Sequence, residues 1–274
     1  MVDYRISKQM LPLTDSALAR DGKVLILAMD HGLEHGPTDF EAVPDTLEPE
    51  TVFEAATHDA VTAMAVQKGV AEAYYPSYED DVALLAKLNG TSNLWMGEPY
   101  SPQNWSVEYA AELGADAIGY TVYPGSNHEP RMFEEFRDAQ ENARDHDLPV
   151  VMWSYARGQG LKNDTKDEVI AYAARIGLEL GADVAKVKYP GSREAMEWAV
   201  DAAGDTKVVM SGGSKVDDYQ FLESVESVID AGGAGLAVGR NVWQRENPGR
   251  ILDALERVIF EEESAEAALS EVES

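Results

Sequence analysis

Eight short apolar runs recur along the chain at intervals of about 30 residues, and most intervals between them carry helix-like patterning. Alternating strands and helices predict parallel βαβ units. Eight strands fit a closed (β/α)8 TIM barrel better than an open doubly wound sheet, and 274 residues suit a single barrel. The predicted strands are Val24–Met29, Ala63–Gln67, Asn93–Met96, Ala117–Val122, Val150–Tyr155, Val184–Tyr189, Lys207–Met210 and Gly235–Val238. The clearest helices are Ser106–Leu113, Pro130–Asp145, Asp167–Leu180 and Arg193–Ala203.

The remaining segments predict a single domain with two appendages. Residues 23–258 would form the barrel, after an N-terminal extension over 1–22. Residues 259–274 are acidic and rich in alanine, which predicts a frayed helix or a disordered tail. The acidic, proline-containing segment Asp39–Thr51 is expected to be a loop after the first strand.

The charge of the chain excludes several kinds of partner. Fifty acidic residues against 22 basic ones give a formal net charge of −28, which would repel nucleic acid and anionic membranes. The chain has no cysteine, so disulfides, cysteine nucleophiles and thiolate metal sites are excluded. No apolar stretch approaches the roughly 20 residues of a membrane helix, and no opening apolar run with basic flanks is present. These features predict a cytoplasmic protein.

In a TIM barrel the chemistry lies at the C-terminal ends of the strands, and two lysines fall at the end of the sixth. Residues i and i+2 of a strand share a face, so Lys186 and Lys188 should project together while Val187 faces the helices. Burial and mutual repulsion would then lower both pKa values, which gives an amine that can form a Schiff base with a ketone. The alternatives are a lysine neutralised by a carboxylate and a lysine that binds phosphate. The sequence does not decide between Lys186 and Lys188.

The fifth and the first strands supply further candidates for acid–base chemistry. Trp153 and Tyr155 should share a face beside the lysines, where the phenol could shuttle a proton and a cationic neighbour would lower its pKa. Core packing is the stronger interpretation of Trp153. Asp30 ends a strongly apolar strand, where a carboxylate could deprotonate a sugar hydroxyl or cap the next segment.

The segment His31–Pro37 raises the question of a metal. Its glycines and proline predict a loop, although His31 and His35 would share a face if it were helical. A catalytic zinc usually needs three protein ligands, and no third one is evident. We therefore expect both histidines to hydrogen-bond to substrate or to stabilise the loop, with no metal.

Glycine-rich turns follow the seventh and eighth strands. In this fold, backbone N–H groups of such turns form a recurrent phosphate site, and an arginine beside them can clamp the anion. The predicted phosphate-binding residues are Ser211, Gly212, Gly213, Gly239 and Arg240.

Taken together, these motifs resemble the archaeal-type class I fructose-bisphosphate aldolases, the DhnA-type group. The resemblance covers roughly residues 20–255 and rests on Leu25–Pro37, Gly119–Gly125, Trp153–Tyr155, Lys186–Lys188, Met210–Gly213 and Ala237–Gln244. Ala156, where many relatives have proline, and the loop Gln159–Lys162 depart from the pattern near the mouth of the site, which bears on substrate range.

The resemblance implies a homo-oligomeric TIM barrel that reversibly cleaves fructose 1,6-bisphosphate through a lysine Schiff base, without a metal or other cofactor. It implies that Lys186 forms the Schiff base and that Tyr155 transfers protons. Asp30 would handle substrate hydroxyls, Trp153 would shape the site and Lys188 would help to hold phosphate. The alternatives are the related 2-amino-3,7-dideoxy-D-threo-hept-6-ulosonate synthase, a metal-dependent aldolase and a non-catalytic protein that binds sugar phosphates.

The excess of acidic residues also predicts adaptation to a salt-rich cytoplasm. At about 1 M salt the Debye length is roughly 3 Å, so most of the self-repulsion of the surface disappears. The midpoint of thermal unfolding should therefore fall clearly when the protein is moved from molar KCl to dilute buffer. An unchanged midpoint in dilute buffer would contradict this adaptation.

Overall fold

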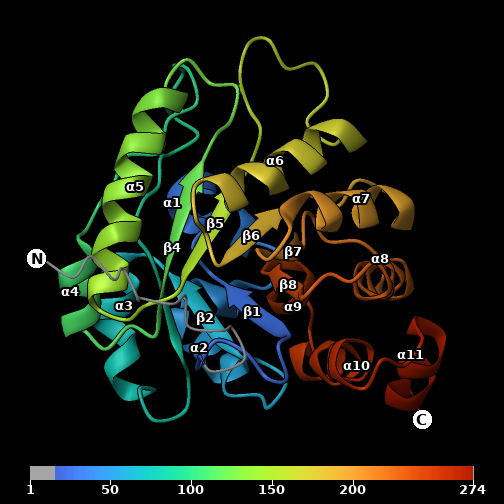
Figure 1. The fold of residues 1–274 in the computed structure, drawn as a ribbon. Helices are drawn as coiled ribbons and strands as arrows, with labels where there is room; N and C mark the ends of the chain where they lie inside the picture. Colours follow the sequence, from blue (N-terminus) through green and yellow to red (C-terminus); the bar gives the residue numbers. More distant parts are fainter. Residues whose placement is uncertain (1–15, 274) are drawn as a thin grey trace, which may run out of the picture.

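A closed barrel of eight parallel strands forms the centre of the molecule (Figure 1). The computed structural model describes residues 16–273. Each strand pairs with the next in sequence, and β8 pairs with β1 to close the ring. The strands are β1 (Val24–Ala28), β2 (Ala63–Val66), β3 (Leu84–Lys87), β4 (Ala117–Val122), β5 (Val150–Ser154), β6 (Val184–Val187), β7 (Lys207–Ser211) and β8 (Gly235–Val238). The predicted TIM barrel is confirmed.

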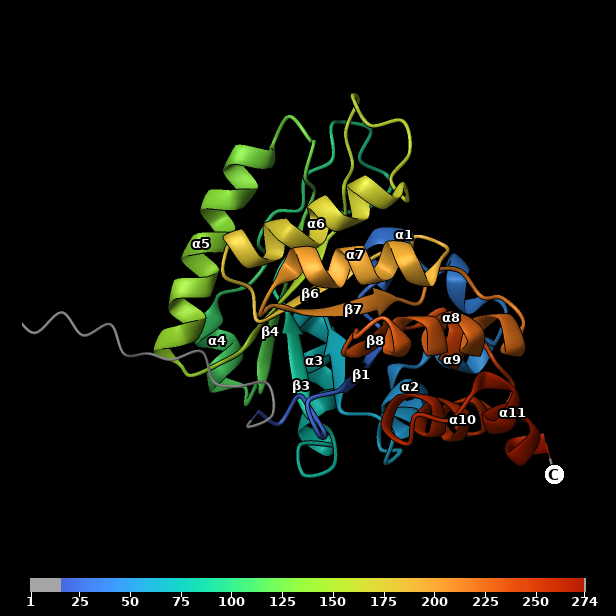
Figure 2. The same cartoon turned by 45° about the vertical axis from the view of Figure 1, so that its right-hand side comes forward.

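Helices surround the barrel and connect successive strands (Figures 1 and 2). The α-helices are α1 (Gly32–His35), α2 (Pro49–Ala56), α3 (Lys68–Tyr74), α4 (Val107–Glu112), α5 (Glu129–Asp145), α6 (Asp167–Glu179), α7 (Arg193–Ala203), α8 (Asp218–Asp230), α9 (Arg240–Trp243), α10 (Pro248–Phe260) and α11 (Ala265–Glu273). Three short 3-10 helices are η2 (Thr38–Phe40), η3 (Pro44–Leu47) and η4 (Tyr75–Ser77). None of the helices within residues 16–273 is long and apolar enough to cross a membrane.

The third predicted strand was wrong. The segment Asn93–Met96 lies in the long connection after β3, where the side chains of Leu94 and Met96 are about nine-tenths exposed. The true strand, Leu84–Lys87, is fully buried but short, and it ends in a lysine. Apolar character alone favoured the wrong segment because a run of four residues carries little periodic information.

Side chains alternate between two cores, as the pleat of a strand requires. Val151 and Trp153 of β5 point into the barrel, whereas Val150 and Met152 pack against the helices. On β6, Val184 lies in the interior core and Val187 in the outer one, as predicted. This alternation directs Lys186 into the mouth of the barrel.

Two surface segments are more ordered than predicted. The C-terminal residues form α11, whose Ala265 and Ala268 are buried, and α11 packs against α8 and α10 (Figure 1). Small alanine side chains on one face allow this close packing, so the expected frayed or disordered tail was wrong for these residues. The expected loop Asp39–Thr51 contains most of η2, all of η3 and the start of α2.

The packing of α6 on β6 generates a test of the fold. A Cβ at Gly177 of α6 would lie 2.8 Å from the Cβ of Ala185 on β6, which is closer than real Cβ atoms approach. Alanine favours a helix over glycine by about 1 kcal/mol, yet we expect Gly177→Ala to lower the free energy of unfolding by about 1–2 kcal/mol through overpacking.

Gly69→Ala in α3 is the matched control, because a Cβ there would meet nothing within 4 Å. Its free energy of unfolding should stay the same or rise. Chemical denaturation in molar salt measures both variants. A stabilised Gly177→Ala variant would show that the contact between α6 and β6 is looser than described.

Candidate active site

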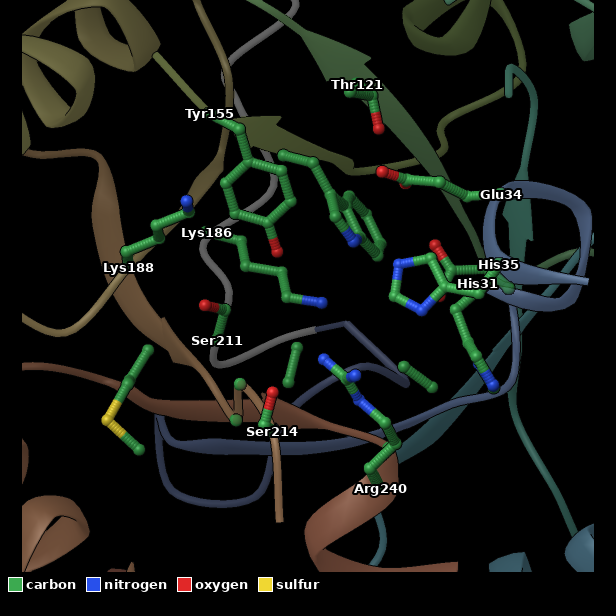
Figure 3. A pocket seen from close by; sticks show the side chains of 18 of the residues that line it. His31, Glu34, His35, Thr121, Tyr155, Lys186, Lys188, Ser211, Ser214 and Arg240 are labelled. Carbon is green, nitrogen blue, oxygen red and sulfur yellow. The ribbon is translucent and has the colours of Figure 1, made fainter. Parts of the chain in front are cut away.

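A cavity of about 560 Å³ opens at the C-terminal ends of the strands. All of the residues that the sequence predicted for catalysis or substrate binding line this one cavity: Asp30, His31, His35, Trp153, Tyr155, Lys186, Lys188, Ser211, Gly212, Gly213, Gly239 and Arg240. The volume lies within the range of small-molecule sites. Figure 3 shows the side chains of Lys186, Tyr155 and Arg240 pointing toward its centre.

Lys186 is a buried amine in the middle of this cavity. The pairing of β5 with β6 sets it directly beside Trp153, and its Nζ lies 4.7 Å from the centroid of that indole ring. Burial lowers the pKa of Lys186 from 10.5 to about 8, although the carboxylates of Asp30 and Glu34 act in the opposite direction. The neutral fraction of the amine at pH 7 is thereby raised by about two orders of magnitude. Such an amine is a competent nucleophile toward a ketone.

Lys188 is not the second buried ammonium that the strand parity predicted. Strand β6 ends at Val187, and the side chain of Lys188 is 30% exposed and forms an ion pair with Asp164. Figure 3 shows its nitrogen turned away from that of Lys186. Lys188 is therefore neutralised by a carboxylate, which was one of the alternatives for the two lysines in the sequence analysis.

Tyr155 extends from the end of β5 with its hydroxyl toward Lys186 (Figure 3). Burial raises the pKa of this phenol well above 10, and the hydrogen bond with Ser211 and the charge of Arg157 lower it only in part. The charge of Arg157 thus acts in the expected direction, but the net fall in pKa that was expected was wrong, because desolvation is the larger effect. A phenol in this environment retains its proton and is suited to donate it.

The turns after β7 and β8 lie close together because glycine permits it. A Cβ at Gly212, after β7, would lie 2.6 Å from Cγ2 of Val238 at the end of β8, and Gly213 has a φ of 64°. The fully buried Asn241 holds the β7 turn by donating from Nδ2 to the carbonyl oxygens of Gly212 and Ser214, at 2.5 and 2.9 Å. Sequence reasoning missed Asn241, whose only signal was a polar residue directly after Arg240.

The two histidines lie on the opposite side of the cavity from Lys188 (Figure 3). His31 directly precedes the one-turn helix α1 and His35 is its last residue, where the sequence predicted a loop. His31 stacks on Trp243 at 4.7 Å between ring centroids, and His35 Nδ1 lies 2.6 Å from Asp39 Oδ2. Arg240 also contacts Asp39, at 3.5 Å. Among residues 16–273, no group of three or more His, Cys, Asp or Glu side chains could hold a metal ion.

Sequence reasoning missed an ionic pair and a second buried lysine. Arg157 Nη1 lies 2.9 Å from Glu34 Oε1, and this pair lines the mouth of the cavity. Lys87, at the end of β3, is 2% exposed and donates to Asn89 O and Oδ1 at 2.5 and 2.9 Å. Lys87 could have been found as a lysine at the end of a short apolar run. It was missed because the third strand was placed at Asn93–Met96 instead.

Comparison with known proteins identifies the class. The family model of DeoC/LacD family aldolases matches residues 24–245, and the chain belongs to this family.

Within that family the chain groups with the class 1 fructose-bisphosphate aldolases of archaea, as the sequence motifs predicted. Such an aldolase from Halobacterium salinarum is 71% identical over 263 residues, which is 96% of this chain and 100% of the relative. One from Thermoproteus tenax is 48% identical over 255 residues, with 92% of this chain and 96% of the relative covered.

A solved structure of an archaeal fructose-1,6-bisphosphate aldolase has its catalytic lysine covalently bound to the carbinolamine intermediate of the substrate. It superposes with a TM-score of 0.86 at 47% identity and covers 89% of this chain and 96% of that one. A 2-amino-3,7-dideoxy-D-threo-hept-6-ulosonate synthase of Halobacterium salinarum is more distant, at 31% identity over 92% of each chain.

The environment of His31 generates a prediction about acid stability. Burial lowers its pKa from 6.5 to about 4, and Nε2 is buried without a hydrogen-bond partner among the described residues. Between about pH 6.5 and 4 the unfolded chain takes up a proton that the folded protein does not. This uptake should reduce the free energy of unfolding by up to about 3 kcal/mol.

His31→Phe should lose this part of the pH dependence, since a phenyl ring can stack on Trp243 and Phe40 as the imidazole does. Denaturation of both proteins between pH 7 and 4.5 in molar salt gives the two slopes. Equal slopes would mean that His31 titrates in the folded protein as it does in the unfolded chain.

Proposed function

We propose that this chain is a metal-independent class I aldolase that reversibly cleaves fructose 1,6-bisphosphate to dihydroxyacetone phosphate and glyceraldehyde 3-phosphate. The observation that carries the proposal is the amine of Lys186. It is buried at the centre of a cavity, with a lowered pKa, between a phenol and glycine turns suited to phosphate. The relatives named fructose-bisphosphate aldolase support the choice of substrate.

The reaction starts with the neutral amine of Lys186 attacking the C2 ketone to give a carbinolamine. Tyr155 donates the proton with which the carbinolamine hydroxyl leaves as water, and the protonated imine then accepts electrons from the C3–C4 bond. Asp30 takes the proton of the C4 hydroxyl as that bond breaks, and the aldehyde leaves. The proton on Asp30 then passes to the Tyr155 phenolate, and Tyr155 protonates the enamine carbon. Water adds to the resulting imine and returns a proton to Tyr155, and collapse of this second carbinolamine releases dihydroxyacetone phosphate and restores the amine.

The phosphate nearest the ketone would lie on the β7 and β8 turns. Ser211, Gly212, Gly213 and Gly239 offer hydroxyl and backbone donors there, and Arg240 supplies a positive charge. Figure 3 supports this placement, because Arg240 and Ser211 lie on the side of Lys186 away from Glu34. His31, His35, Trp153 and Lys188 would shape and hold the rest of the substrate.

Trapping of the imine tests this proposal. In molar salt with chelator, borohydride and dihydroxyacetone phosphate should leave a reduced adduct on Lys186, identified by peptide mass analysis. Lys186→Met should abolish both the adduct and turnover of fructose 1,6-bisphosphate while the unfolding midpoint stays within a few degrees, since methionine fills similar apolar space.

Lys207→Met, at the exposed start of β7, is the control and should trap and turn over like the natural protein. An adduct without fructose 1,6-bisphosphate cleavage, but with product from a keto-sugar phosphate and aspartate semialdehyde, would favour the synthase. Loss of activity with chelator would favour a metal-dependent aldolase. Binding without any adduct would favour a non-catalytic sugar-phosphate protein.

The wider setting is part of the same proposal. We infer a homo-oligomer that works in the cytoplasm, in glycolysis or gluconeogenesis, with a surface adapted to high salt. The formal charge of −28 and the relative from Halobacterium salinarum support the salt adaptation.

A further inference from the structure

Two lysine amines, one from β6 and one from β3, lie near the same indole ring, that of Trp153. Lys186 Nζ of β6 lies 4.7 Å from the centroid of Trp153, and Lys87 Nζ of β3 lies 5.5 Å from it. Both side chains are at most 5% exposed and both line the cavity. Two ammonium groups that lie near one buried ring repel each other. The pair of lysines therefore favours carrying a single added proton over carrying two.

The surroundings of the two amines are unequal. Lys87 donates to two oxygens of Asn89, at 2.5 and 2.9 Å. Within residues 16–273, Lys186 Nζ has neither a hydrogen bond nor an ion pair at contact distance. Hydrogen-bond acceptors stabilise the charged form of an amine, so the shared proton belongs on Lys87.

A buried network fixes the acceptors of Lys87. Asn89 is fully buried and donates from Nδ2 to the carbonyl oxygens of Ser101 and Thr121, and its Oδ1 also accepts from the Thr121 N–H at 2.7 Å. Gln67 Nε2 donates to the Asn89 carbonyl oxygen, and Trp105 Nε1 donates to the Lys87 carbonyl oxygen. A single rigid arrangement at the ends of β2, β3 and β4 thus holds the ammonium.

From this geometry we propose that Lys87 is a positioning residue, a fixed ammonium that keeps Lys186 in the neutral form required for attack on the ketone. The inference rests on the proposed Schiff-base function. Lys87 acts on Lys186 through charge and does not itself react.

The other charged and titratable groups around Lys186 come from several elements that face it. Asp30 after β1 and Glu34 in α1 favour its charged form, and both also favour the charged form of Lys87. Burial nevertheless lowers the pKa of Lys87 to about 8, and the charge of Lys186 acts in the same direction, so the hydrogen bonds to Asn89 are what distinguish the two amines. Glu34 is itself paired with Arg157. Tyr155 on β5 holds its proton, and His31 beside α1 stays neutral at pH 7. Lys188 and Arg240 each form an ion pair with an aspartate. Among the described residues that line the cavity, Lys87 is therefore the cation near Lys186 that has no carboxylate at contact distance.

The test follows the rate of borohydride trapping with dihydroxyacetone phosphate against pH, in molar salt. Buried charges are screened little by salt, so the interaction should persist there. In Lys87→Met the acid limb of the profile should move up by about one pH unit, because the repulsion from Lys87 is removed while Asp30 and Glu34 still stabilise the ammonium of Lys186. Trapping near pH 7 should fall about tenfold and should recover to the natural rate at high pH.

Two matched variants separate charge from structure. Lys87→Arg retains the positive charge and should return the acid limb toward its natural position. Lys207→Met makes the same substitution at the other end of the barrel and should leave the limb unchanged. Lys87→Met should fold, because both Asn89 oxygens keep another donor, Gln67 Nε2 and the Thr121 N–H.

The proposal would be overturned if folded Lys87→Met trapped more slowly at high pH while the acid limb of its pH profile stayed in place. Lys87 would then have a structural role. Titration of ¹⁵N-lysine amines in the natural protein gives an independent reading that needs no variant. Lys186 should lose its proton at lower pH than Lys87, and the reverse order also overturns the proposal. If the natural protein traps no adduct on Lys186, the Schiff-base function itself has failed.

Discussion

The desolvation of lysine amines at the mouth of a closed barrel is the constraint on which the site depends. An amine in water holds its proton at neutral pH, and only burial or a neighbouring charge makes it a nucleophile. The barrel provides the burial, because alternation along β6 directs Lys186 inward while Val184 and Val187 fill the two cores on either side of the sheet. The register of β5 with β6 then places Trp153 beside that amine.

Packing far from the chemistry sets this geometry. Gly177 lets α6 approach β6, and Asn241 holds the β7 turn against the start of α9, so β6 and the β7 turn are each fixed by a residue outside the cavity. The residues that hold the ends of β3 and β4 are polar and buried, which is tolerable because the side-chain amide and the backbone carbonyl oxygen of Asn89 have partners. A partly satisfied network there would cost more than an apolar one.

Sequence periodicity predicted the barrel and seven strands because those strands are strongly apolar and separated by amphipathic helices. The alternation of side chains along β5 and β6 was enough to predict Trp153, Tyr155 and Lys186 as site residues. It failed for Lys188, since a strand's alternation ends where its hydrogen bonding ends, at Val187. The choice between the two lysines needed the family resemblance, and the physical distinction is that Asp164 neutralises Lys188.

Lys87 marks the kind of residue that pattern reasoning cannot place. Its neighbours in the site come from β1, β5 and β6, and nothing in the local sequence states that β3 faces them across the barrel. The chain is acidic overall, yet Asn89 supplies neutral oxygens to the Lys87 amine, and no carboxylate within residues 16–273 lies at hydrogen-bonding distance from it. A carboxylate partner in that position would cancel the charge that Lys186 experiences, whereas an amide leaves it intact. The choice of asparagine at position 89 therefore has a physical consequence for an amine carried by another strand.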